Sequence, residues 1–92
     1  MYVILVYDIA MDDNGAKVSR NVFKICKKYL THVQCSVFEG EISKVQMKKL
    51  KTELQVWVRE EKDSVILFHS RNERWLDKDI MGKQDVMLDN FL

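Results

Sequence analysis

Proline is absent from the sequence, and glycine occurs only three times. Both residues mark turns and loops, so their scarcity excludes a loop-rich or low-complexity chain. Hydrophobic residues make up 47% of the 92 positions, which indicates a single domain, residues 1–92, built mainly of helices and strands. A domain of this size buries only about 60 to 65% of its unfolded surface, so self-association would add stability.

The sequence also lacks a cysteine framework, a histidine cluster and a long hydrophobic run. Cys26 and Cys35 have no paired spacing, so we expect reduced core thiols rather than a disulfide or a metal pair. His32 and His69 stand alone, and we assign neither a catalytic role. The first apolar run is too short to span a bilayer and has no positive leader or cleavage site, so we expect a cytoplasmic protein with no membrane partner.

Neither sign of charge dominates, since the formal net charge is +1, and this total does not predict nucleic-acid binding. The distribution along the chain is uneven. Basic residues outnumber acidic ones in residues 1–51, and the reverse holds in residues 52–92. Residues 16–38 contain no acid at all.

A helix is predicted from Ala16 to about Tyr29, because apolar residues recur there at steps of three and four. Its opposite arc is basic and carries the candidate contacts to nucleic-acid phosphates: Lys17, Arg20, Lys24 and Lys28. An ordinary solvated face also carries lysines, but such faces normally mix both signs. Phosphate binding and plain solvation are therefore two interpretations of this face.

An unbroken apolar run from Tyr2 to Tyr7 ends at Asp8. β-branched and aromatic side chains in such a run are typical of a central strand covered on both faces. Asp8 is then expected at the carboxyl end of the strand, where ligand crevices form because the strand fixes the side chain and the next loop leaves it accessible. Asp is also a favoured turn residue, so the alternative is that Asp8 merely starts a turn.

The remaining sequence predicts further strands and a second helix. Alternating residues from His32 to Ile42 predict a strand with a bend at Gly40, and Ser43 is the expected N-cap of the amphipathic helix that follows. Residues 65–68 predict a second central strand, and residues 71–92 predict short edge strands.

The order strand, helix, strand, helix, strand is typical of an α+β ferredoxin-like sandwich, in which two helices cover one face of an antiparallel sheet. The first strand is apolar on both sides, although the helices can cover only one of them. We therefore expect a homodimer through the other sheet face, with residues 84–92 as a C-terminal strand that packs on the partner protomer.

The chain resembles the CRISPR-associated Cas2 family in three segments: Tyr7-Asp8-Ile9, residues 33–40 (VQCSVFEG) and Asp63-Ser64-Val65. The likeness runs along the whole chain. Residues 71–76 and 90–92 are similar to the corresponding stretches in one branch of that family.

The resemblance implies a homodimeric ferredoxin-like protein of CRISPR adaptation, which acquires new spacers together with the Cas1 integrase. Many members are described as magnesium-dependent endonucleases that hydrolyse RNA or double-stranded DNA. The resemblance also implies that Asp8 is the catalytic metal ligand and that the Asp8 carboxylates of the two protomers share one Mg²⁺ or Mn²⁺. Tyr7 and Ser36 would flank the phosphate as further contacts.

No histidine or second acid in the sequence is an obvious general base, so two other functions stay open. The first is a non-catalytic scaffold whose basic helix face bridges duplex DNA through backbone contacts while Cas1 performs the transfer. The second is a toxin-like messenger-RNA interferase, since such proteins share this small layout and a fold does not fix a function.

Overall fold

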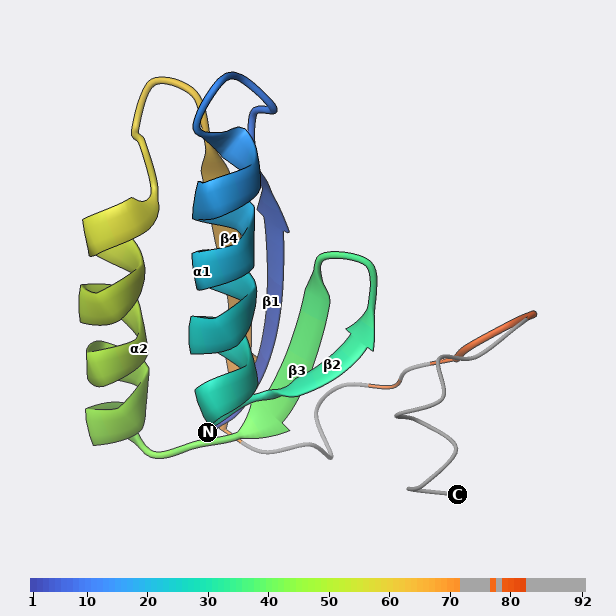
Figure 1. The fold of residues 1–92 in the computed structure, drawn as a ribbon. Coiled ribbons are helices and arrows are strands. Elements are labelled where there is room, and N and C mark those ends of the chain that lie inside the picture. Colours follow the sequence, from blue (N-terminus) through green and yellow to red (C-terminus); the bar gives the residue numbers. More distant parts are fainter. Residues whose placement is uncertain (72–76, 78, 83–92) are drawn as a thin grey trace.

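A computed structural model describes residues 1–71, 77 and 79–82 of the chain. Its regular elements follow the order β1 (Tyr2–Asp8), α1 (Gly15–Tyr29), β2 (Thr31–Gln34), β3 (Val37–Glu41), α2 (Lys44–Trp57) and β4 (Ser64–Ser70) (Figure 1). The strands form one antiparallel sheet in the order β2-β3-β1-β4, and both helices cover the same face of it. This arrangement confirms the predicted α+β ferredoxin-like fold.

Both helices bury one apolar stripe against the sheet, as the spacing of their sequences predicts, and Val22 and Leu50 are fully buried. Ser43 is the N-cap of α2: its hydroxyl accepts from the Gln46 N–H at 3.1 Å, and Gln46 Oε1 accepts from the Ser43 N–H at 2.9 Å. This reciprocal capping box fixes where α2 begins. In the described part of the chain, neither helix is long and apolar enough to cross a membrane.

The strand predicted from residue 32 to residue 42 is wrong in one respect, because the chain reverses direction within it. β2 and β3 form a hairpin that turns at Cys35 and Ser36, and Cys35 has a left-handed backbone conformation with φ of 42°. Cys35 is consequently exposed rather than in the core, whereas Cys26 is buried as predicted. Both thiols are free.

Gly40 does not form the predicted bend. It pairs with Val3 in the regular ladder between β1 and β3. A Cβ on Gly40 would lie 3.2 Å from Leu30 Cδ2, so the glycine leaves room for the segment that leads from α1 into β2.

The prediction that residues 65–68 form a central strand is also wrong for the described part of the chain, where β4 is the last strand of the sheet and pairs only with β1. Its apolar run has a different cause. Val65 and Leu67 pack against the core, while Ile66 and Phe68 point to the other side and are exposed. The C-terminal strand predicted in residues 84–92 lies outside the described residues, as do most of the positions predicted as short strands after residue 71.

The side chains of β1 alternate between the two faces of the sheet. Leu5 and Tyr7 are buried on the side of the helices, whereas Val6 and Asp8 point to the side that carries neither α1 nor α2, which we call the open face. Ile66 of β4 lies opposite Val6 in the ladder and is 49% exposed. The open face is therefore apolar and accessible near β1 and β4.

Candidate functional site

Asp8 is the last residue of β1 and lies opposite Ser64 in the ladder with β4. Its side chain is exposed on the open face, in the same row as Ile4 and Val6. Pairing with β4 fixes the backbone while the carboxylate reaches solvent. A ligand-binding carboxylate needs this combination of a fixed backbone and an accessible side chain.

The loop after Asp8 is bound to the loop before β4 by one side chain, Arg59. The guanidinium donates to both Asp12 oxygens at 2.7 and 2.8 Å, to Asp63 at 2.8 and 3.1 Å, and to the Ala10 carbonyl oxygen at 2.9 Å. Asp63 also accepts from the Ala10 N–H at 2.9 Å. The N–H and the carbonyl oxygen of Ala10, two residues after Asp8, therefore both have side-chain partners. We call these contacts the Arg59 network.

Hydrogen bonds in the Arg59 network lower the pKa of two carboxyl groups. The Arg59 guanidinium is the main reason that the pKa of buried Asp63 falls to about 2. Hydrogen bonds from Lys62 and then from Arg59 hold the pKa of Asp12 well below its usual range. Both acids are ionised and paired at neutral pH, so they hold the loop and are poor proton acceptors.

Gly15 begins α1 against this loop. A Cβ at this position would lie 2.3 Å from the Ala10 carbonyl oxygen, much closer than real contacts allow. Any side chain at residue 15 would therefore push Ala10 away from Arg59. The glycine is required for the loop to close on the end of the helix.

No sequence pattern indicates Arg59, whose contact with Asp12 joins residues 47 positions apart. The one signal near the network is the segment 63–65, which resembles Cas2 and includes Asp63. The role of Asp63, which accepts hydrogen bonds from Arg59 and from the Ala10 N–H, becomes clear only from the packing of the loop after β1 against the loop before β4.

The structure does not bring the Tyr7 ring to Asp8 within one chain. Tyr7 is buried on the helix side of the sheet, where burial is the main cause that raises its pKa. Ser36 is closer to the predicted site, because it lies in the hairpin turn and its carbonyl oxygen accepts from the Tyr7 N–H at 3.1 Å. A contact from the Ser36 side chain to a phosphate stays a prediction, and the Tyr7 hydroxyl faces away from the open face.

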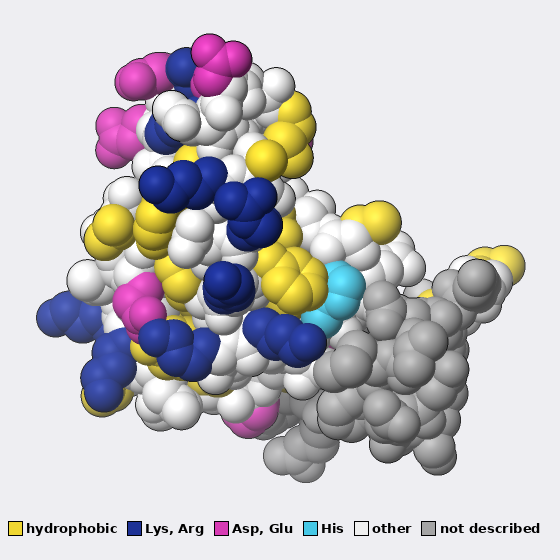
Figure 2. All heavy atoms as spheres, in the orientation of Figure 1, with side chains coloured by type: hydrophobic (Ala, Val, Ile, Leu, Met, Phe, Trp, Pro, Cys, Tyr) yellow, Lys and Arg dark blue, Asp and Glu magenta, His cyan; other side chains and the backbone are white. Residues whose placement is uncertain are grey.

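The basic row predicted on α1 is exposed at each of its positions: Lys17, Arg20, Lys24 and Lys28. Lys28 donates to Glu53 at 2.5 Å, whereas Arg20 and Lys24 have no hydrogen bond or ion pair with another described residue. Figure 2 shows basic side chains gathered over the two helices. This surface is on the opposite side of the sheet from Asp8, so one chain does not bring the two predicted sites together.

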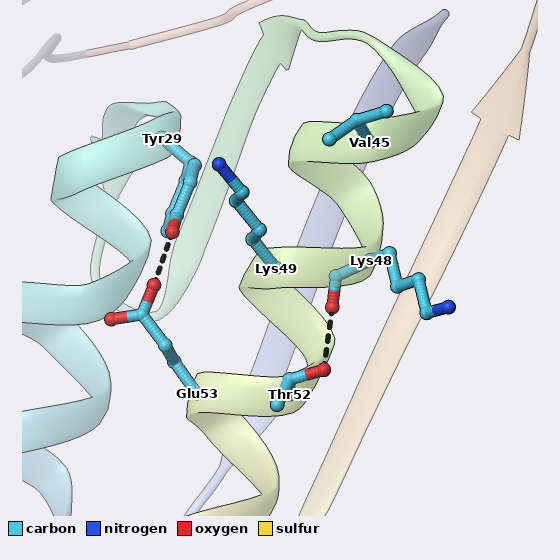
Figure 3. Close-up of a pocket in the computed structure, with 6 residues that line it drawn as sticks. All are labelled: Tyr29, Val45, Lys48, Lys49, Thr52 and Glu53. Atoms are coloured by element: carbon cyan, nitrogen blue, oxygen red, sulfur yellow. Dashed lines mark hydrogen bonds between the residues drawn. The ribbon is translucent and has the colours of Figure 1, made fainter.

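A surface hollow lies between α1 and α2 (Figure 3). In it, the Glu53 carboxylate accepts hydrogen bonds from Lys28 and from the Tyr29 hydroxyl, which lower its pKa. The Thr52 hydroxyl donates to the Lys48 carbonyl oxygen at 2.9 Å. These contacts join the helices and satisfy polar groups of the hollow, so we assign it a structural role.

The described residues of one chain contain no cluster of three His, Cys, Asp or Glu side chains that could hold a metal ion. Asp8 supplies the hard oxygen atoms that Mg²⁺ and Mn²⁺ prefer, but a single carboxylate is too few. The donor chemistry fits a divalent cation when a second chain contributes its own Asp8. Any metal site at this position therefore depends on dimerisation.

The fold and the exposed Asp8 define a small ferredoxin-like protein with one candidate metal-ligating carboxylate in each chain. The family model described as CRISPR associated protein Cas2 matches residues 1–78, and the chain belongs to this family.

Relatives and solved structures agree with this assignment. The chain is 51% identical over 92 residues to the CRISPR-associated endoribonuclease Cas2 of Fusobacterium nucleatum, covering 100% of this chain and 87% of that protein. It is 43% identical to the CRISPR-associated endoribonuclease Cas2 2 of Moorella thermoacetica, covering 98% and 100% of the two chains. The crystal structure of Streptococcus pyogenes Cas2 superposes with a TM-score of 0.72 at 30% identity, covering 85% of this chain and 98% of that one.

Proposed function

We propose that the chain acts as a homodimeric endonuclease of a CRISPR system, in which two Asp8 carboxylates hold one divalent cation beside a phosphodiester bond. The observation that carries this proposal is the exposed Asp8 at the end of β1, on a sheet face that is apolar and open. The relatives from Fusobacterium nucleatum and Moorella thermoacetica carry the name endoribonuclease, which supports RNA as the substrate.

The open face supplies the surface for pairing. Ile66 and Phe68 are 49% and 57% exposed, and Ile66 lies beside Val6. Ile80 lines a hollow together with Val37 of β3. Residues near position 80 therefore lie along the β2 and β3 edge of this face, away from β4. Two sheets packed face to face lie about 10 Å apart, a distance at which side chains from both sheets meet.

Asp8 occupies the same row as Val6, at the end of the open face. A two-fold axis that passes near this end would bring the two Asp8 carboxylates together. A Mg²⁺ ion held by them would polarise the phosphodiester and lower the pKa of a bound water.

The contribution of the chain itself is positional. β4 pairs with the backbone of Asp8, and the Arg59 network fixes Ala10 two residues further on. Precise placement of the carboxylate matters because catalysis by positioned groups falls steeply when they move. Ser36 in the neighbouring turn would be a further contact to the phosphate.

We further propose that the dimer serves CRISPR adaptation, acquiring new spacers together with the Cas1 integrase, a role supported by family membership. A second candidate function is a non-catalytic scaffold, and the exposed Arg20 and Lys24 favour it because backbone contacts position duplex DNA without reading its sequence. The two functions differ in their need for Asp8.

The substitution Asp8→Asn tests the catalytic proposal, because it keeps the shape of the side chain and removes its charge. We expect cleavage of a labelled single-stranded RNA in Mg²⁺ to fall by about 100-fold or more, since metal-assisted catalysis is worth several kcal/mol. The same loss is expected for the unaltered chain after chelation of Mg²⁺. Asp13→Asn is the matched control, because Asp13 is an exposed acid in the next loop.

Sedimentation should show that Asp8→Asn is still a dimer, and a duplex DNA binding assay should show unchanged affinity. Cleavage by Asp8→Asn at the rate of the unaltered chain, in a preparation free of other nucleases, would contradict the nuclease proposal. A dimer that binds duplex DNA and cuts neither nucleic acid would favour the scaffold.

A further inference from the structure

A hollow of about 480 Å³ lies at the end of the sheet remote from Asp8, where β4 ends and α2 begins (Figure 1). Ser70, the last residue of β4, lies opposite Tyr2 at the start of β1, and Lys44 is the first residue of α2. The volume is within the range of about 300–1,000 Å³ that is typical of small-ligand sites. We call it the basic hollow, and its lining residues are Met1, Lys44, His69, Ser70 and Arg71.

Three exposed side chains supply nitrogen donors to the basic hollow: Lys44, His69 and Arg71. None of them has a hydrogen bond or an ion pair with another described residue. No carboxylate belongs to the described lining. Glu41 contacts Met1, but its carboxylate already accepts from the Met1 ammonium at 2.7 Å. The described residues therefore leave the positive charge of the hollow unneutralised.

Two elements hold these donors at one place. His69 lies opposite Val3 in the ladder between β1 and β4, and Arg71 directly follows β4. The capping box fixes Lys44 at the first position of α2, whose first turn contains no acid. The partial positive charge at the start of a helix adds to that of the side chains. The site is thus built from the end of a paired strand and the start of a capped helix.

The number of donors indicates the kind of anion. A terminal phosphate on a strand carries a charge of about −1.5 to −2 at neutral pH and has three strong acceptor oxygens, whereas each phosphate within a strand carries one charge. A guanidinium binds two phosphate oxygens in parallel, and an ammonium binds as a point charge. Three donors without partners therefore suit a terminal phosphate better than an internal one.

The described lining contains no Phe, Tyr or Trp ring on which a nucleobase could stack. The phosphate group itself is then the part of the ligand that is recognised, whatever base follows it. The hollow is also too far from Asp8 to act on the same phosphate, since the six residue steps of β1 between Tyr2 and Asp8 span about 20 Å.

We propose that the basic hollow binds the terminal phosphate of a nucleic-acid strand, with Lys44, His69 and Arg71 as donors to its oxygens. This inference rests on the proposed function in that it takes nucleic acid as the ligand. The hollow anchors a strand by its end, at a place separate from the carboxylate proposed to cut. Its preference is for the chemistry of the end and not for a sequence.

Fluorescence anisotropy tests the inference with labelled strands of one sequence that carry a phosphate or a hydroxyl at the 5′ end, and with the matching 3′ pair. A chelator in the buffer prevents a metal at Asp8 from adding a second phosphate site. We expect the phosphorylated strand of at least one pair to bind about tenfold more tightly. Lys44→Gln and Arg71→Gln should each reduce this preference to less than about threefold and leave affinity for the hydroxyl strand within about twofold.

Lys51→Gln is the matched control, because Lys51 is an exposed lysine on the same helix and does not line the basic hollow. It should keep the full preference. Equal affinity for phosphate and hydroxyl ends in both pairs would overturn the inference. So would a preference that survives in both the Lys44 and Arg71 variants, or an equal loss in the control.

Inorganic phosphate, added at constant ionic strength against chloride, distinguishes a strand end from a free anion. It should displace the phosphorylated strand only at concentrations about 100-fold above the dissociation constant of that strand, because it lacks the other contacts of the strand. Displacement at the dissociation constant itself would assign the hollow to free phosphate and overturn the strand end as its ligand. Equal displacement of the hydroxyl strand would overturn the inference too.

The two proposals fail in different ways. Asp8→Asn should keep the preference for a phosphorylated end, because Asp8 is at the other end of β1. Cleavage by a chain that binds both kinds of end equally would overturn the basic hollow and leave the nuclease standing. A preference for phosphorylated ends in a chain that never cuts would overturn the nuclease and leave the basic hollow standing.

Discussion

At the scale of single residues, the Arg59 side chain makes five hydrogen bonds, more than any other side chain in the described residues. Its side chain joins Asp63, Asp12 and the Ala10 carbonyl oxygen, and Asp63 has a fully buried side chain. A buried carboxylate is stable only when its charge is paired and hydrogen-bonded. The loss of either partner would therefore affect both the stability of the fold and the loop that follows Asp8.

The pairing of Asp63 predicts a dependence of stability on pH. Its pKa of about 2 in the folded protein is below the value of about 3.9 for an unfolded chain, so its contribution is complete above about pH 4 and is lost as the pH falls toward 2. Asp63→Asn should lower the free energy of unfolding at pH 7 by about 1–3 kcal/mol. It should also reduce the loss of stability between about pH 4 and pH 2, which we call the acid limb.

Urea unfolding measured between pH 2 and pH 7 checks this prediction. Asp13→Asn is the control, because Asp13 is exposed and its removal should leave the acid limb as it is. An acid limb of the same steepness in Asp63→Asn would show that other carboxyl groups cause it.

The residue scale also shows how far the sequence alone can lead. Asp8 was predictable in position, because an apolar run that ends in an acid indicates a strand and its exit. The two faces were harder to assign, since the run is apolar on both sides and does not say that Tyr7 lies under the helices while Asp8 is on the open face. Arg59 was not predictable, because two of its three partners, Asp12 and Ala10, come from a different loop.

At the scale of elements, both helices follow from the sequence and the hairpin does not. Periodicity of three and four residues and the Ser43 cap define the helices locally. Alternation continues unbroken across a two-residue turn, so residues 32–42 read as one strand although the chain reverses at Cys35. The edge position of β4 in the described sheet depends on the order of the strands, which no local pattern contains.

The basic face of α1 predicts a salt dependence for binding to duplex DNA. Lys24 has no partner among the described residues, whereas Lys28 is already paired with Glu53. Lys24→Gln should reduce the slope of log affinity against log salt by about 0.9, and Lys28→Gln should reduce it by less.

A salt titration followed by anisotropy, with Lys51→Gln on α2 as the exposed control, measures these slopes. A flat response to salt in the unaltered chain would show that the helix face is only solvated. Equal slopes for the Lys24 and Lys28 variants would show that the ion pair with Glu53 does not limit Lys28.

At the scale of the whole molecule, the open face predicts a dimer that one charge can disrupt. Phe68 is 57% exposed there. A two-fold axis through this face would bury the Phe68 side chains of both protomers. Burial of a phenylalanine is worth about 1.5–3 kcal/mol, so Phe68→Lys should weaken dimerisation by about 100-fold or more. Cleavage should fall with it, because the proposed metal site needs the Asp8 carboxylates of two chains.

Sedimentation over a range of concentrations measures this change. Val56→Lys is the matched control, since Val56 is 76% exposed on α2 and lies on the helix side. A monomer at all concentrations of the unaltered chain would show that no such interface forms. A dimer unaffected by Phe68→Lys would place the interface elsewhere, and either result would remove the basis for a shared metal.

The sheet separates the helix surface proposed to hold nucleic acid from the carboxylate proposed to cut it. If both act on one strand, that strand has to travel around the rim of the molecule before a phosphodiester reaches Asp8. Oligonucleotides of a few nucleotides would then occupy one side without reaching the other. The footprint of the nucleic acid, rather than its base sequence, would decide whether it is merely retained or also processed.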